Sequence, residues 1–130
     1  MSLNVQTIRK ILEAVVMELK LIKADSDYTH VALSGRLDCD GVASITSDFA
    51  DMVVDRGKPA IVDMTEVASV SASGMRMLLD AAEALQTHDA KLVLYNAQPL
   101  VLEVLQTAGF SASMPMESDL VRALALLKKS

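Results

Sequence analysis

The chain has 130 residues, of which 52% are hydrophobic and only 3% aromatic, so it can bury one continuous core of aliphatic side chains without disulfides or metals. Its formal net charge of -5, with lysine and arginine scattered along the sequence, excludes the clustered basic face that a nucleic-acid-binding protein needs. The single cysteine, Cys39, excludes an internal disulfide framework and is typical of a protein from a reducing compartment.

No targeting or membrane segment is recognisable in the sequence. No apolar run approaches the roughly 20 residues that span a bilayer, and the N-terminus lacks the basic, apolar and small-residue order of a signal peptide. We therefore expect a cytoplasmic protein with no direct membrane insertion. Residues 1–16 are expected to form a leading helix or a tail, with the first three resembling a tag scar.

The first part of the expected domain is a β-hairpin followed by a helix. Apolar and polar residues alternate over 17–22, residues 25–27 are a turn signal, and 28–33 is the returning strand. An amphipathic helix is expected over 41–55, ended by Gly57. Residues 60–62 are then a short buried strand.

The second part alternates helices and strands. We expect a helix over 74–86, a buried strand over 91–95, a third helix from Pro99 onward, and a final helix capped by Ser118. Strands that alternate with helices of this length need crossover connections. The pattern therefore predicts an α/β fold, in which a mixed, largely parallel β-sheet with an N-terminal β-hairpin is flanked by about four helices.

Four short segments carry a family resemblance. They are, in chain order, LSGRLD at 33–38, IVDMTEV at 61–67, VSASGMRMLL at 70–79 and LQTAGF at 105–110. Their order and spacing resemble the STAS family, named for sulfate transporters and anti-sigma factor antagonists. The resemblance implies a STAS domain over 17–130, with a curved sheet and a role as a phosphorylation-controlled binding module.

The resemblance also implies a site in the serine loop at 70–74. In the family's antagonists, the serine or threonine directly before the loop glycine is phosphorylated by a partner anti-sigma kinase, and the matching residue here is Ser73. The usual aspartate two residues earlier is replaced by Ser71, which makes Ser71 an alternative acceptor, and Met75 replaces the usual leucine. The residues expected to bind partners are Asp38, Asp63, Ser71, Gly74, Met75 and Arg76.

The same residues also have a purely structural interpretation. Ser71 and Ser73 both precede an expected helix, where serine commonly caps free backbone N–H groups. Asp38 and Asp63 each follow an expected strand, so both are expected at the sheet edge that carries the serine loop, because α/β sites form at the carboxyl ends of strands. There they either orient the hydroxyl and contact the kinase, or only cap the following turns.

Patterns typical of catalysis or metal binding are missing from the sequence. The serine loop lacks the glycines of a nucleophile elbow, and one cysteine with two distant histidines shows no ligand spacing. We therefore expect no enzyme activity, no cofactor and no metal.

Two functions stay open at this point. The first is an anti-sigma factor antagonist of the bacterial partner-switching type, which binds an anti-sigma factor with serine kinase activity, is released after modification of Ser73, and is restored by a phosphatase. The alternative is a constitutive STAS subunit of a membrane transporter complex, such as a lipid-transport ATPase or an anion permease.

Overall fold

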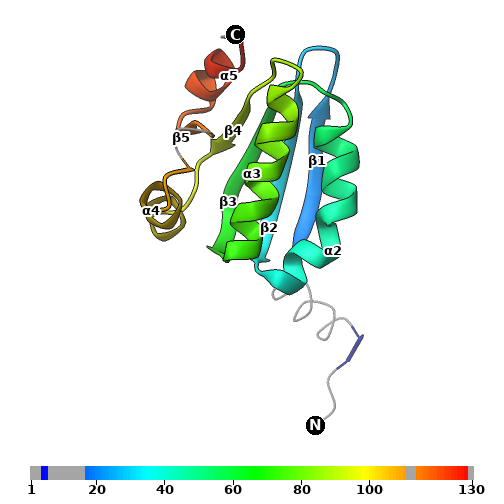
Figure 1. The fold of residues 1–130 in the computed structure, drawn as a ribbon. Coiled ribbons are helices and arrows are strands. Elements are labelled where there is room, and N and C mark those ends of the chain that lie inside the picture. Colours follow the sequence, from blue (N-terminus) through cyan, green and yellow to red (C-terminus); the bar gives the residue numbers. More distant parts are fainter. Residues whose placement is uncertain (1–3, 6–16, 111–113, 129–130) are drawn as a thin grey trace.

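The computed structural model describes residues 4–5, 17–110 and 114–128. Its elements, shown in Figure 1, are β1 (Glu18–Ala24), β2 (Thr29–Leu37), α2 (Cys39–Phe49), the π-helical turn η1 (Ala50–Val54), β3 (Ala60–Val70), α3 (Ala72–Gln86), β4 (Leu92–Tyr95), α4 (Pro99–Thr107), β5 (Met116–Glu117) and α5 (Leu120–Lys128). The expected leading helix or tail lies outside the described residues, except for Asn4 and Val5. Within the part described, no helix combines the length and hydrophobicity needed to cross a bilayer.

All five strands form one sheet in the order β1-β2-β3-β4-β5. β1 and β2 are antiparallel, and the turn between them is closed by Asp25, whose Oδ1 accepts hydrogen bonds from Asp27 N at 2.8 Å and Tyr28 N at 3.0 Å. The other neighbouring strands are parallel, and helices make the crossovers between them. The predicted mixed sheet with an N-terminal hairpin is therefore confirmed.

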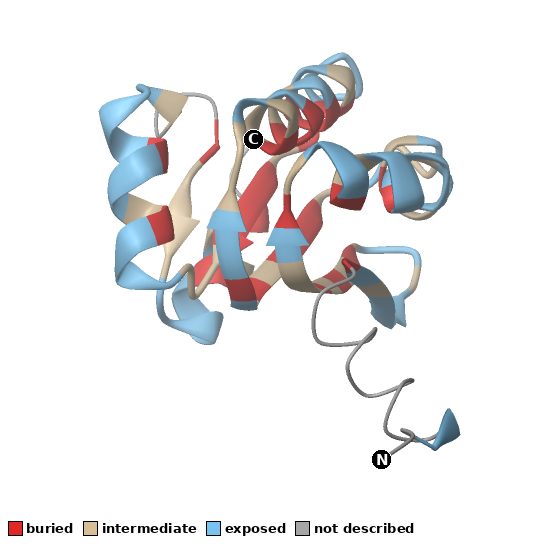
Figure 2. Cartoon of the chain, turned by 90° about the horizontal axis from the view of Figure 1, so that it is seen from below, coloured by how far each residue is buried: buried red, intermediate tan, exposed pale blue. Residues whose placement is uncertain are grey.

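The main core lies on the face of the sheet covered by α2 and α3, which lie side by side in Figure 1. It contains fully buried side chains such as Phe49 of α2 and Leu78 and Leu85 of α3. On the other face, Ile61 and Val93 pack against α5 in a smaller cluster. Figure 2 shows the buried residues concentrated in the central strands and on the inward sides of the helices.

Two strands differ from the prediction. β3 extends over 60–70 rather than 60–62, because its second half pairs with β2 as far as Val70 opposite Leu37. Register shifts interrupt this pairing after Ala32 and after Gly35, so the buried positions do not keep a strict alternation. β5 was not predicted, since two residues are too few to show a period.

The helix starts also differ from the prediction. α2 begins at Cys39 and α3 at Ala72, each two residues earlier than expected. The cap of α5 is Asp119 rather than Ser118, because Asp119 Oδ1 accepts a hydrogen bond from Val121 N at 2.8 Å. The end of the first helical segment agrees with expectation, since Gly57 has a φ of 63°.

The last two carbonyl groups of β2 lie directly against the first turns of α2 and α3. A Cβ atom at Gly41 would lie 2.3 Å from Arg36 O, and one at Gly74 would lie 2.4 Å from Leu37 O. Both distances are far below the van der Waals contact of carbon and oxygen, so any larger residue would push its helix off the end of the strand. The two glycines therefore fix where both helices begin relative to the sheet.

Gly74→Ala should destabilise the protein. Alanine is ordinarily more favourable than glycine in a helix by about 1 kcal/mol, but here the clash with Leu37 reverses the sign. We expect the free energy of unfolding in urea to fall by about 1–3 kcal/mol. Ser47→Ala, on the exposed side of α2, is the control and should change it by less than about 0.5 kcal/mol. A Gly74→Ala variant as stable as wild type would contradict the close approach.

Candidate functional site

Ser71 caps α3. Its Oγ accepts a hydrogen bond from Gly74 N at 3.3 Å and donates one to Leu37 O at 3.1 Å. Its backbone N–H also donates to Leu37 O, at 2.9 Å. The Ser71 hydroxyl thus joins α3 to the end of β2, and a phosphate on it would remove the proton that it donates to Leu37 O and place negative charge against that carbonyl.

Ser73 lies in the first turn of α3 and does not cap it. Its Oγ lies 3.0 Å from Cys39 Sγ, at the first residue of α2, in a contact open to solvent. Either atom is able to donate in this hydrogen bond. The capping interpretation of Ser73 is therefore wrong, because α3 begins at Ala72 with Ser71 as its N-cap, so that Ser73 lies inside the helix.

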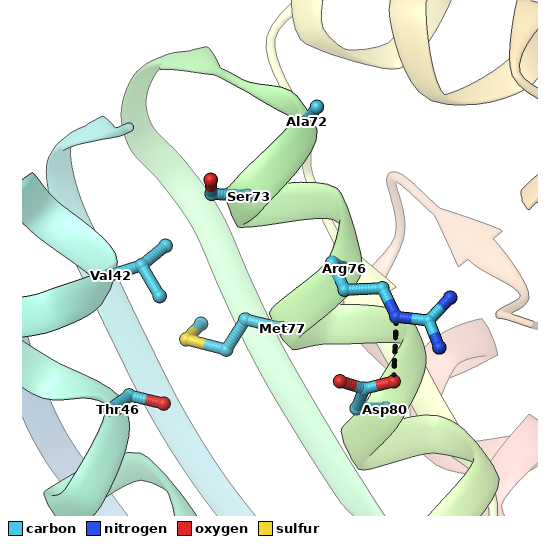
Figure 3. A pocket seen from close by; sticks show the side chains of 7 residues that line it. All are labelled: Val42, Thr46, Ala72, Ser73, Arg76, Met77 and Asp80. Atoms are coloured by element: carbon cyan, nitrogen blue, oxygen red, sulfur yellow. Dashed lines mark ion pairs between the residues drawn. The ribbon is translucent and has the colours of Figure 1, made fainter. Parts of the chain in front are cut away.

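A shallow groove of about 440 Å³ runs between α2 and α3 in front of Ser73. Its lining residues are Val42, Thr46, Ala72, Ser73, Arg76, Met77 and Asp80. Figure 3 shows the Ser73 hydroxyl on the side of α3 that faces Val42, and the Arg76–Asp80 ion pair farther along the same helix and farther from Val42. Two lining residues, Ser73 and Thr46, carry hydroxyl groups, and Ser73 lies in the first turn of α3, next to the start of α2.

Three of the other expected partner-binding residues lie close to Ser73. Asp38 caps α2, since its Oδ1 accepts a hydrogen bond from Gly41 N at 2.9 Å. Gly74 is buried, and the backbone that approaches it closely is that of Leu37 in the same chain. Met75 is half-buried and packs against the main core. Of these three, only Asp38 and Met75 keep surface that a partner is able to contact.

Asp63 does not lie at the edge with the serine loop, so its expected position is wrong. It belongs to the first half of β3, opposite Tyr95, because the strand continues as far as Val70. Its Oδ1 accepts hydrogen bonds from Thr65 N at 2.9 Å and Thr65 Oγ1 at 2.5 Å. Burial lowers the pKa of His30, and the negative charge of Asp63 offsets part of that lowering.

The contact between Cys39 and Ser73 was missed by the sequence analysis. The two residues are 34 positions apart, and no motif links them. A weak signal was present in the two helix starts, because Asp38 and Ser71 are each followed by a glycine three residues later. Within the described residues, no group of three or more histidine, cysteine or acidic side chains is placed to hold a metal ion.

A family model described as STAS domain matches residues 20–123. BtrV of Bordetella bronchiseptica, named as a candidate anti-sigma factor antagonist, is 25% identical over 112 residues, which are 86% of this chain and 96% of BtrV.

Solved structures of similar fold carry related names. An anti-sigma factor antagonist from Mycobacterium paratuberculosis has a TM-score of 0.75 at 17% identity, covering 87% of this chain and 95% of that one. The anti-sigma factor antagonist SpoIIAA of Bacillus has a TM-score of 0.70 at 20% identity in its unphosphorylated form, covering 85% and 96% of the two chains. Its phosphorylated form has a TM-score of 0.64 at 19% identity, covering 85% and 100%. These likenesses show the fold.

Replacing the two serines by alanine should separate the cap from the exposed hydroxyl. Ser71→Ala removes the cap of α3 and should lower the free energy of unfolding by about 1 kcal/mol. Ser73→Ala removes only a solvent-open contact and should change it by less than about 0.5 kcal/mol. Urea unfolding of both variants beside wild type measures the difference. A larger loss in Ser73→Ala than in Ser71→Ala would show that the roles are exchanged.

Proposed function

Because the chain belongs to the STAS domain family, we propose that it is a bacterial anti-sigma factor antagonist that exchanges partners when Ser73 is phosphorylated. The names of BtrV and of the similar solved structures support this role. The proposed partners are an anti-sigma factor with serine kinase activity and a phosphatase, all in the cytoplasm. The match from residue 20 onward supports a domain over 17–130, preceded by a separate leading segment.

One observation carries the choice of Ser73. Of the two serines in the loop, Ser71 holds the start of α3, whereas among the described residues the Ser73 hydroxyl forms a hydrogen bond only with the Cys39 thiol. A kinase that modifies Ser73 leaves the cap and the close approach of Leu37 intact. The modified protein therefore keeps its fold and changes only its surface. Structures of SpoIIAA in its unphosphorylated and phosphorylated forms both match the fold of this chain, which supports this view.

Ser71 takes over the capping role of the aspartate that the family usually has at this position. Aspartate and serine are both strong N-cap residues, and Ser71 makes the hydrogen bond to Gly74 N that a capping aspartate would make. The substitution thus keeps the helix start and removes one negative charge beside Ser73. The proposed kinase therefore recognises a loop with one negative charge fewer than the usual loop of the family.

The free energy of the switch comes from charge. A phosphate adds about -1.5 to -2 charge at neutral pH, and an unpaired charge buried in a partner's site for a neutral hydroxyl costs several kcal/mol. Moving a partner from almost fully bound to almost fully free takes about 5.5 kcal/mol. Phosphorylation in this groove, beside the exposed Arg76 and the half-buried Met75, therefore changes the binding free energy by the order of magnitude that release requires.

Protein isolated from its native cells should carry one phosphate, and peptide mapping should place it on Ser73. The phosphate should be absent from Ser73→Ala and retained in Ser71→Ala, which is the matched control because it removes the neighbouring hydroxyl. Intact mass gives the occupancy under each growth and stress condition. A phosphate on Ser71, or none under any condition, would count against the switch, and the second result would favour the constitutive transporter subunit.

Charge at position 73 should weaken binding to the cognate anti-sigma kinase. Ser73→Asp places a carboxylate where the partner meets a hydroxyl and should raise the dissociation constant at least about tenfold, since one unpaired charge costs more than 1.4 kcal/mol. Ser73→Asn has nearly the same shape without the charge and is the control. Titration calorimetry of both variants measures the difference. Equal weakening by Asp and Asn would show that shape, and not charge, governs release.

A further inference from the structure

Arg76, one helical turn after Ser73, is held by a weak ion pair. Its Nε lies 3.1 Å from Asp80 Oδ1, and the two side chains are 69% and 57% exposed. Ion pairs this exposed to solvent contribute little to stability. The order along the helix, with the cation before the acid, is also the weaker of the two orders. Little free energy is therefore needed to move the guanidinium away from Asp80.

Helix geometry favours a movement of Arg76 toward Ser73. Residues three apart are neighbours on a helix surface, and long side chains in helices lean back over the turn that precedes them. Both residues line the same groove. Figure 3 shows the guanidinium turned toward Asp80, away from the Ser73 hydroxyl. A change of side-chain rotamer is enough to bring it back over the first turn of α3.

The α2 side of Ser73 is unfavourable for a phosphate. The Cys39 thiol occupies the space 3.0 Å from the hydroxyl on that side. The N-terminus of α2 also carries two carboxylates, Asp38 and Asp40, which repel an added negative charge. On α3 the charged side chains of the groove are Arg76 and Asp80. Arg76 is thus the cation of this groove that a phosphate on Ser73 would attract.

We propose that Arg76 exchanges Asp80 for the phosphate when Ser73 is phosphorylated, an inference that rests on the proposed modification of Ser73. The guanidinium then pairs with phosphate oxygens, and Asp80 is left without its counter-ion. The unmodified groove presents a hydroxyl beside a neutral ion pair, whereas the modified groove presents a phosphate–arginine pair beside a free carboxylate. A partner loses access to Arg76 and meets Asp80 unshielded, so Arg76 determines which form of the protein a partner recognises.

The exchange is measurable without any kinase. Phosphoserine inserted at position 73 during translation gives the modified protein, and a ³¹P NMR titration gives the second pKa of its phosphate, ordinarily about 6. Because Arg76 stabilises the dianion, Arg76→Gln should raise this pKa by about half a unit, and Asp80→Asn should lower it by freeing the arginine. Arg122→Gln, exposed on α5, makes the same change in net charge and should leave the pKa unaltered.

The inference is overturned if Arg76→Gln titrates like wild type, or if Arg122→Gln shifts the phosphate pKa as far as Arg76→Gln does. A second measurement needs no variant, since the Nε–H resonance of Arg76 should move when phosphoserine replaces Ser73. An unchanged resonance also overturns the exchange. A failure of the proposed function is distinct from these results, because it appears as missing phosphate in native cells and leaves the titration unaffected.

Discussion

At the end of β2, two successive backbone carbonyls are pressed against the first turns of two different helices. The Arg36 carbonyl faces Gly41 of α2, and the Leu37 carbonyl faces Gly74 of α3 while accepting two hydrogen bonds from Ser71. This contact sets the position of both helix starts against the sheet, and from it follow the Cys39–Ser73 distance and the groove between the helices. Ser73 is a candidate site because the backbone around it is held by residues other than itself.

The different roles of the two loop serines follow from that arrangement. Ser71 faces the strand, and its hydroxyl caps the helix, whereas Ser73 faces the neighbouring helix and the solvent. A modification that broke the cap would lower the stability of the protein and raise the fraction of unfolded chains in the cell. The proposed modification two residues later would leave the cap in place and change only the surface that a partner contacts.

The fold class could be predicted because hydrophobic periods of two and of 3.6 residues alternate along the chain. Ser73 could be proposed as a site because short motifs mark its loop. The second half of β3 escaped prediction, since the register shifts opposite β2 interrupt the alternation of buried residues. Asp63 was misplaced for the same reason, because the apolar triplet before it looked like a whole strand. The choice between Ser71 and Ser73 as cap depends on a helix start two residues earlier than expected. The contact with Cys39 depends on how two helices pack, which no local pattern records.

α2 and α3 begin alike, each with a capping side chain, two intervening residues and a glycine. In this alignment Asp40 holds in α2 the place that Ser73 holds in α3, the second residue of the helix. An aspartate there is a fixed anion that the dipole of α2 stabilises at all times. A phosphate on Ser73 would give α3 the same complement. Under the proposed modification, the two helices would thus begin with matched negative charges, of which that of Asp40 is encoded in the sequence and that of Ser73 would be added and removed by enzymes.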